Sequence, residues 1–255
     1  MATKKIDFNS DLAQGFGIYK NDLEYEMLDY VSSVNVSCGF HAGDPLSIKK
    51  ALLACKDKNV AVGAHIGFQD ISGFGNRPME LSEDEIEAIV LYQLGAIASF
   101  AKSYNLNIEH VRPHGAMYKM ASENFEFSLS IAKAIQKFDK WLTYVGLANE
   151  TLEKVSAETN IVIAREVFAT RNYNADGTVN WEMGAVSPEI SQNRVRTLSH
   201  SSQMKIQGGN FIPVECDTIH FPCDSKETIE LAKKLNEIIT PTPFNYNRVE
   251  TSGWV

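Results

Sequence analysis

Short apolar runs recur along the chain, and each is followed by a stretch in which apolar residues keep helical spacing. The first run, residues 5–11, alternates between two sides, and its polar side carries Asp7, Asn9 and Asp11. Such a polar side would be out of place beneath a covering helix. It suits a strand that points these side chains into the mouth of a barrel, and the alternative is a solvated edge strand.

Seven runs predict strands, at residues 5–11, 34–38, 60–65, 108–113, 142–147, 161–166 and 216–221. Helices are expected between them, at residues 23–31, 46–58, 82–101, 126–138, a stretch ending at 157, 187–205 and 228–239. Strands that alternate with helices form parallel sheets. No repeat or linker divides the chain. We therefore expect one α/β domain over residues 1–255, a seven-stranded, irregular (β/α) barrel with residues 241–255 as a surface tail.

Capping sequences mark the starts of several helices. Ser82 and Glu85 form a capping-box pattern before the most regular helix, and residues 224–227 repeat the pattern before the last one. Asp44 and Pro45 suit the first turn of another helix. Capping therefore explains Asp44 without any function, and contact with a substrate is the second hypothesis for it.

Two long loops follow His65 and Glu166. Loops of this length inside a compact domain tend to be functional or disordered. Phe68 and Phe74 in the first loop favour an ordered lid. We expect both loops to close over a ligand.

The acidic composition excludes some partners. The formal net charge is −8 and no block of like charge stands out, which argues against binding to nucleic acid or an anionic membrane. From the first residues of the sequence we expect no signal segment, and no stretch is apolar enough for us to expect a membrane span. The 4 cysteines form no C-x-x-C pair, so we expect reduced thiols and a cytoplasmic protein.

Polar and titratable residues recur where the predicted strands end. They are Asp11, His41, His65, His114 and Glu166. The carboxyl ends of the strands carry the active site in (β/α) barrels. An open doubly wound sheet, the alternative fold, would gather such groups only near one crevice. Contributions from so many strands favour the barrel, and we interpret these five residues as candidate catalytic groups.

Histidines and carboxylates in this arrangement support two kinds of chemistry. A divalent metal such as Mg or Zn could be held by Asp11 with two of the histidines, and the candidate ligands are Asp11, His65 and His114. Alternatively, the same groups move protons without a metal while others hold the substrate. The chain has no H-E-x-x-H, phosphate-loop or G-x-S-x-G motif that would decide between the two. Arg112 shares a strand face with His114 and could clamp a substrate carboxylate.

Some neighbouring residues have simpler explanations. Between Gly39 and Gly43, His41 is interpreted as a presented side chain. Cys38 could act as a nucleophile, but its strand-end setting favours a packing role. His110 lies deeper along its strand, where we expect a hydrogen-bonded core residue.

Taken together, five segments resemble the LamB/YcsF lactam-utilization family, which supplies the A subunit of the prokaryotic 5-oxoprolinase. They are Asp7-Phe8-Asn9-Ser10-Asp11, residues 32–45 (SSVNVSCGFHAGDP), Gly63-Ala64-His65, residues 110–115 (HVRPHG) and Arg165-Glu166-Val167-Phe168. The resemblance runs from residue 5 to residue 224 with the motifs in the order of the family.

This resemblance implies a (β/α) barrel of the glycoside hydrolase/deacetylase type. It also implies ATP-dependent opening of 5-oxo-L-proline to L-glutamate with two partner subunits, so that ATP is the expected cofactor. Activation by ATP suits a lactam, because its amide is a poor electrophile with a poor leaving group. Residues within the family motifs are Asp7, Asn9, Asp11, His41, Asp44, His65, His114 and Glu166. Of these, Asp7, Asn9 and Asp44, together with Arg112, are the candidate substrate-binding residues.

The chain also departs from the family pattern. The D-L-G-E-G-F-G of the family has Gln14 in place of its glutamate, its H-G-D is here Pro222-Cys223-Asp224, and Lys119 replaces an expected asparagine. Three hypotheses therefore stay open: a hydrolase of cyclic amides that uses ATP and partner subunits, a metal-dependent deacetylase-like hydrolase, and a catalytically degenerate lactam-binding subunit. Association into a homo-oligomer is left open too.

Overall fold

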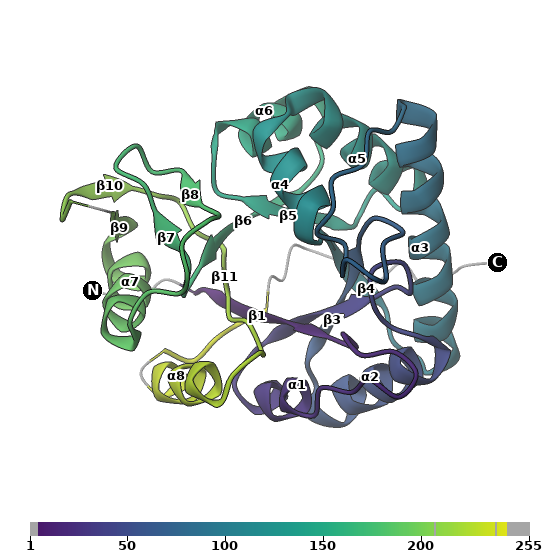
Figure 1. The fold of residues 1–255 in the computed structure, drawn as a ribbon, viewed down its shortest axis with the longest axis horizontal. Coiled ribbons are helices and arrows are strands. Elements are labelled where there is room, and N and C mark those ends of the chain that lie inside the picture. Colours follow the sequence, from purple (N-terminus) through teal and green to yellow (C-terminus); the bar gives the residue numbers. More distant parts are fainter. Residues whose placement is uncertain (1–4, 207, 238, 244–255) are drawn as a thin grey trace.

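A closed barrel of seven parallel strands forms the centre of the computed structural model, which describes residues 5–206, 208–237 and 239–243 (Figure 1). Around the barrel the strand order is β1-β11-β6-β5-β4-β3-β2. The strands are β1 (Asp7–Leu12), β2 (Ser33–Ser37), β3 (Ala61–Ile66), β4 (Ile108–Pro113), β5 (Thr143–Leu147), β6 (Ile163–Phe168) and β11 (Thr218–His220). The prediction of a seven-stranded α/β barrel is confirmed.

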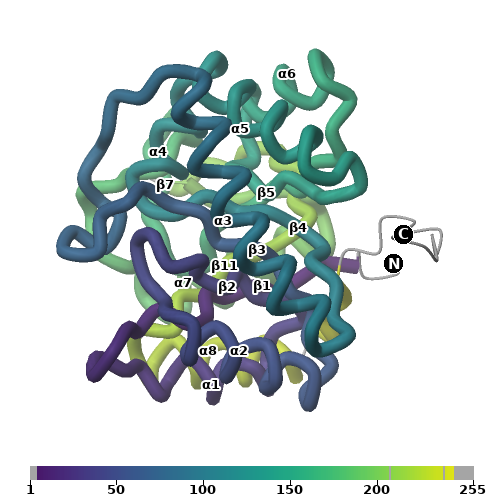
Figure 2. Tube along the Cα trace, turned by 90° about the vertical axis from the view of Figure 1, so that its right-hand side faces the viewer, coloured from purple at the N-terminus to yellow at the C-terminus, as the bar shows by residue number. Residues whose placement is uncertain are grey.

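Helices surround the strands, and α1, α2 and α8 lie together along one side in both views (Figures 1 and 2). The helices are α1 (Leu23–Glu26), followed by a 3-10 turn at Met27–Asp29, α2 (Pro45–Lys58), α3 (Glu83–Ser103), α4 (Gly115–Glu123), α5 (Phe125–Phe138), α6 (Glu150–Thr159), α7 (Pro188–Ser201) and α8 (Lys226–Asn236). Within the described residues, none of them has the length and apolar character needed to cross a membrane.

The barrel is closed by β1, which pairs with β2 on one side and with the last strand, β11, on the other. Its apolar side is buried outward, with Phe8 packed against Phe221 at 5.0 Å between ring centroids. Its polar side faces inward, since Asn9 lies opposite Ser33 of β2 and hydrogen-bonds across the barrel. The interpretation of residues 5–11 as a barrel strand with a polar interior face is thereby confirmed.

Some expected boundaries were wrong. The sequence pattern did not predict α4, which starts at Gly115 with a positive φ of 52°. Helix α7 ends at Ser201 instead of 205, because the following residues form β9 (Gln203–Lys205), which pairs with β10 (Phe211–Pro213). A second small hairpin joins β7 (Asn172–Tyr173) to β8 (Val179–Asn180). Both hairpins lie in the long connection from β6 to β11.

Serine side chains cap α3, α7 and α8. The Ser82–Glu85 capping box forms at the start of α3. The capping box expected at residues 224–227 is wrong: Ser225 caps the last helix by accepting a hydrogen bond from the Thr228 amide, so this helix starts at Lys226, two residues earlier than expected. The expected surface tail, residues 241–255, lies outside the described residues from 244 onward.

A buried carboxylate anchors the connection from β1 to α1. Glu24 is 4% exposed, and its Oε2 accepts a hydrogen bond of 3.0 Å from the Gln14 amide. Burial raises the pKa of Glu24 to about 7 despite this bond, because the charged form loses its hydration. The folded protein therefore holds a proton there over a pH range in which the unfolded chain has lost it.

We expect Glu24→Gln to remove a pH-dependent loss of stability. The unfolded carboxyl titrates near 4.5 and the folded one near 7, so wild-type stability falls as pH rises through this window. Glutamine keeps an acceptor for the Gln14 amide and does not titrate. The variant should be more stable than wild type at pH 8, by up to about 3 kcal/mol, and similar to it at pH 4. Urea denaturation at both pH values measures this, with the exposed Glu26→Gln as the control. Parallel pH profiles for wild type and Glu24→Gln would contradict the prediction.

Candidate active site

An ion pair between two barrel strands lies at the centre of the site. Arg112 of β4 donates from Nε to Glu166 Oε1 of β6 at 2.8 Å, and from Nη2 to Oε2 at 2.8 Å. Both residues are buried, with exposures of 4% and 0%. Burial would raise the pKa of Glu166, but the Arg112 charge outweighs it and the net shift is downward. The pair is therefore charged and rigid, as bidentate arginine–carboxylate pairs are.

Asp11 at the end of β1 connects this pair to the histidines. Its Oδ1 accepts from Asn35 Nδ2 at 3.0 Å and lies 3.4 Å from Arg112 Nη1 and from His65 Nε2. Its Oδ2 lies 3.3 Å from His220 Nε2. Burial alone would raise the pKa of Asp11, but His65, Arg112 and His220 hold it well below its ordinary value. Asp11 is therefore an anion that holds these groups together.

Asp7 and Asn9 lie deeper in the barrel. The Asp7 carboxylate accepts hydrogen bonds of 2.6, 2.8 and 2.6 Å from Ser32, Ser33 and Thr218. Burial raises its pKa to about 6, and these hydroxyl donors reduce the shift. Asn9 donates to Thr218 Oγ1 at 2.6 Å and to the β6 carboxylate at 3.0 Å. Both residues are 1% exposed, so they support the charged groups above them from within the core.

Three histidines gather on the other side of Asp11. The rings of His41 and His114 stack in parallel, 4.0 Å apart at 9°, and the edge of His65 meets both. Burial lowers the pKa of His41 well below its ordinary value and that of His114 to about 3. Both rings are therefore neutral at pH 7.

The loop after β3 covers these histidines. His114 Nε2 donates to the carbonyl oxygen of Phe74 at 2.7 Å, and the Phe74 ring meets the His114 ring edge-on. Phe68 anchors the start of the loop, since it is fully buried. An ion pair between Asp70 and Arg77 braces the loop internally. These contacts hold the loop over the histidines, and its closure over a ligand stays a prediction.

His65 and His114 each use one ring nitrogen for a backbone carbonyl, and their other two nitrogens face each other. His65 Nδ1 lies 3.1 Å from the carbonyl oxygen of Arg112, and His114 Nε2 lies 2.7 Å from the carbonyl oxygen of Phe74. Carbonyl oxygens only accept, so both of these nitrogens carry hydrogen. The remaining nitrogens, His65 Nε2 and His114 Nδ1, then face each other 3.0 Å apart with their lone pairs. A proton shared between the two nitrogens, or a metal ion bound by both, would stabilise this arrangement.

The same residues fit a metal. Metal-bound histidines commonly donate their second N–H to a backbone carbonyl, and His65 and His114 both do so. Ligand atoms around a tetrahedral zinc ion lie about 3.3 Å apart, close to the 3.0 Å between these nitrogens and the 3.4 Å from His65 Nε2 to Asp11. His41 has a ligand atom within 4.8 Å of theirs, but its ring is parallel to that of His114, so their lone pairs do not converge. Among the described residues, the group whose ligand atoms all lie within 4.8 Å of one another is His41, His65 and His114, without Asp11, so the expected ligand set of Asp11, His65 and His114 stays a prediction.

The structure does not bring Asp44 into the cluster. Its side chain accepts hydrogen bonds from the amides of Leu46, Ser47 and Gly17, so it caps α2. The capping interpretation of Asp44 is confirmed, and substrate contact stays a prediction.

Two further interpretations are confirmed. His110 is a buried core residue whose Nε2 is hydrogen-bonded to Asn35 Oδ1 at 2.8 Å. Cys38 is 3% exposed and donates to the Val36 carbonyl oxygen, and burial raises its pKa to about 12, which favours a protonated packing thiol. All 4 cysteines, Cys38, Cys55, Cys216 and Cys223, are free and buried.

Sequence reasoning missed His220. It lies at the end of β11, a strand whose apolar run gave it no special weight, and it reaches Asp11. A signal was present nonetheless, because His220 occupies the carboxyl end of a predicted strand as His65 does.

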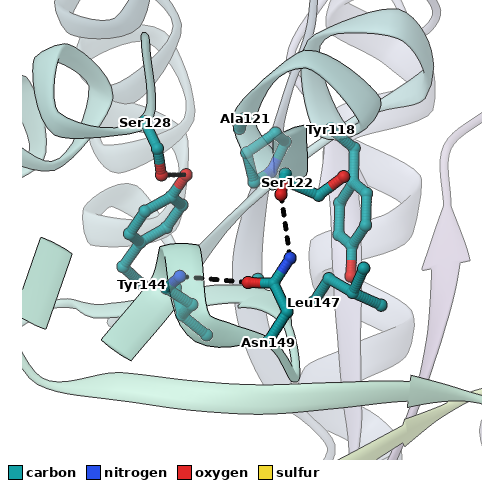
Figure 3. A pocket seen from close by; sticks show the side chains of 10 residues that line it. Tyr118, Ala121, Ser122, Ser128, Tyr144, Leu147 and Asn149 are labelled. Carbon is teal, nitrogen blue, oxygen red and sulfur yellow. Dashed lines mark hydrogen bonds between the residues drawn. The ribbon is translucent and has the colours of Figure 1, made fainter. Parts of the chain in front are cut away.

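A very small cavity lies beside β4 and β5, and hydrogen bonds between residues around it hold this side of the barrel together (Figure 3). Its volume is about 10 Å³, room for one water and no substrate. Tyr118 lines it and covers the Arg112 guanidinium with its ring, 4.8 Å from the centroid. Asn149 ties the far wall together by donating to the Ser122 carbonyl oxygen and accepting from the Leu152 amide.

Comparison with known proteins gives consistent matches over most of the chain. The model of the LamB/YcsF family matches residues 6–252. The chain is 38% identical to the 5-oxoprolinase A subunit of Thermococcus sibiricus over 237 residues, covering 91% of this chain and 93% of the relative. The corresponding protein of Campylobacter jejuni subsp. doylei gives the same identity and coverage. The crystal structure of a lactam utilization protein from Thermus thermophilus superposes with a TM-score of 0.87 at 33% identity, covering 92% of this chain and 97% of that one.

We expect Glu166→Gln to destabilise the protein by about 3 kcal/mol, because breaking a buried ion pair leaves an uncompensated charge. The matched control is Glu153→Gln. Glu153 pairs with Arg165, next to Glu166 in the sequence, but its side chain is 49% exposed. That change should cost less than about 1 kcal/mol. Urea denaturation at pH 7 compares the two, and equal effects would show that the Arg112–Glu166 pair is not the constraint inferred here.

Proposed function

The chain belongs to the LamB/YcsF family, and from this premise we propose that it is a subunit of an ATP-dependent 5-oxoprolinase. It would cleave 5-oxo-L-proline, or a related lactam, to L-glutamate together with two partner subunits. The observation that carries the proposal is the charged cluster of Asp11, Arg112 and Glu166 beside the histidines, at the carboxyl ends of the barrel strands. This position is where (β/α) barrels carry out chemistry.

The reaction needs activation of a poor electrophile. Phosphoryl transfer from ATP to the amide oxygen releases ADP and makes the ring carbon electrophilic. Water adds to that carbon, and the C–N bond breaks as the nitrogen takes a proton. A second water then releases phosphate from the acyl phosphate and leaves L-glutamate. The protein must therefore orient a water and move protons at the ring carbon and nitrogen.

Three members of the cluster keep some exposure and can meet a substrate. They are Asp11 at 8%, His114 at 9% and His220 at 6%. Asp11 stays ionised and orients the imidazoles that face it. His114 shares a short nitrogen–nitrogen contact with His65, an arrangement that can hold and pass on one proton. Arg112 and Glu166 neutralise each other and keep the strand ends in place.

The cluster does not suit a triphosphate on its own. Arg112 is its only arginine or lysine among the described residues, and Glu166 and Asp11 already engage it. A nucleotide bound at the cluster would therefore meet two carboxylates, and the cation of the cluster is already engaged by both. This favours a nucleotide site supplied with the help of the partner subunits.

The departures from the family pattern at Gln14 and Cys223 lie next to each other. Gln14 Nε2 donates to Cys223 Sγ at 3.2 Å, and the thiol donates to the backbone oxygen of Asp11 at 3.2 Å. The two substitutions therefore form one polar contact, and the ion cluster beside it stays complete. This supports an active subunit over a catalytically degenerate one.

With its partner subunits present, we expect this chain to release glutamate from 5-oxo-L-proline only when ATP is added. His114→Ala should lower the rate by roughly 10²–10⁴, the typical contribution of a positioned acid or base. The exposed His200→Ala on α7 is the control and should leave the rate unchanged. Binding of the lactam without turnover in the complete complex would favour the degenerate-subunit hypothesis instead.

A second candidate is a metal-dependent, deacetylase-like hydrolase that needs no ATP. The observation that favours it is the facing pair His65 Nε2 and His114 Nδ1 beside Asp11. These three residues would hold the metal, which would supply a water activated at neutral pH.

Metal analysis separates the two candidates. The second predicts about one zinc or similar ion per chain after purification without chelators, lost in His65→Ala and His114→Ala and kept in His200→Ala. It also predicts amide hydrolysis without ATP. Wild-type protein that takes up no ion when Zn²⁺ is offered would exclude the metal-dependent candidate.

A further inference from the structure

A cavity of about 450 Å³ opens beside the ion cluster, at the ends of β6 and β11. Helices α7 and α8 lie on one side of the barrel (Figure 1), and Thr228 of α8 lines the cavity. Its size falls within the range of small-molecule sites, roughly 300–1,000 Å³. The lining residues are Phe168, Thr170, Arg171, Ala185, His220, Pro222, Asp224, Ser225 and Thr228. Most of them come from the connections that follow β6 and β11.

His220 links this cavity to the ion cluster. It lines the cavity, is 6% exposed, and lies with Nε2 3.3 Å from Asp11 Oδ2. Its Nε2 faces the Asp11 carboxylate, whereas its Nδ1 has no hydrogen-bond partner among the described residues. Buried polar atoms are normally satisfied, so this imidazole is placed to meet a group that is not part of the chain. Because the Asp11 carboxylate only accepts, a neutral ring turns its N–H toward Asp11 and keeps its other nitrogen as an acceptor.

One cation and one anion flank the imidazole. The exposed Arg171 forms no ion pair within the described part of the chain, and its guanidinium lies 6.0 Å from the Trp181 ring centroid. Asp224 likewise has no ion-pair partner there. A guanidinium binds a carboxylate bidentately, whereas a carboxylate and an imidazole acceptor both bind N–H groups. Phe168 and Pro222 add an apolar wall.

We propose that this cavity binds a small cyclic amide that carries a carboxylate, with Arg171 on the carboxylate and His220 on the amide group. The inference deepens the proposed function and rests on it, since 5-oxo-L-proline has both groups. It assigns substrate contact to His220 and Arg171. The apolar ring of such a ligand would lie against Phe168 and Pro222, and the amide would be held beside Asp11.

Calorimetric titration of the purified chain with 5-oxo-L-proline and with 2-pyrrolidinone, the same ring without the carboxylate, tests the assignment. Arg171→Gln should lower the affinity for 5-oxo-L-proline about 10- to 100-fold, the effect of losing one hydrogen-bonded charge, and leave the affinity for 2-pyrrolidinone unchanged. His220→Gln should lower the affinity for both ligands. Arg196→Gln and His200→Gln, exposed on α7, are the matched controls. Thermal melts show whether each variant folds.

The outcomes separate the cavity from the proposed function. If the variants behave as expected but the complete complex releases no glutamate, the cavity assignment stands and the proposed function fails. If turnover is normal while Arg171→Gln and His220→Gln bind and react like wild type, the proposed function stands and the cavity assignment is overturned. Failure of the wild-type chain to bind 5-oxo-L-proline would overturn the assignment as well.

Discussion

The pairing of buried charges constrains this structure more than any other interaction. Arg112 is held by Glu166 and Asp11; the three residues come from three different strands and are each at most 8% exposed. Removing any one of them leaves a charge that the interior cannot solvate. The amides, hydroxyls and histidines around the pair follow from the same constraint, because each remaining lone pair or hydrogen needs a partner. The apolar core lies outside the barrel strands. Inside the barrel, each strand can carry only side chains that pair with the polar groups at its centre.

Much of the fold followed from local chemistry. The alternation of Asp7, Asn9 and Asp11 predicted an inward polar face, and Ser82 with Glu85 predicted the start of α3. The gathering of Asp11, His65, His114 and Glu166 followed from the rule that parallel strands align their carboxyl ends. Helix α4 escaped prediction because its start at Gly115 needs a left-handed backbone imposed by the packed loop at Gly75, whose carbonyl oxygen bonds the Ala116 amide.

The finer arrangement of the site depended on tertiary geometry. No sequence pattern indicates that His41 and His114 stack in parallel, or that two nitrogens of His65 and His114 face each other. His220 shows the same limit, since its role depends on the distance to Asp11 across the barrel. Asp44 differs, because local sequence rules explained it: although it lies within a family motif, its carboxylate accepts hydrogen bonds from the amides of its own helix and of Gly17.

Pairing of β1 with β11 also governs the order of assembly. Asn9 lies beside His220, and Asp7 receives its third hydroxyl from Thr218, more than two hundred residues away along the chain. Contacts so distant in sequence form late, since the loop between them must be closed first. During synthesis, the first strand therefore leaves the ribosome with a polar face that cannot be completed until nearly the whole chain has followed. Two helices on either side of the gap, α1 and α8, can meet only at that stage, so the nascent barrel is an open sheet with two unpaired edges for most of its synthesis.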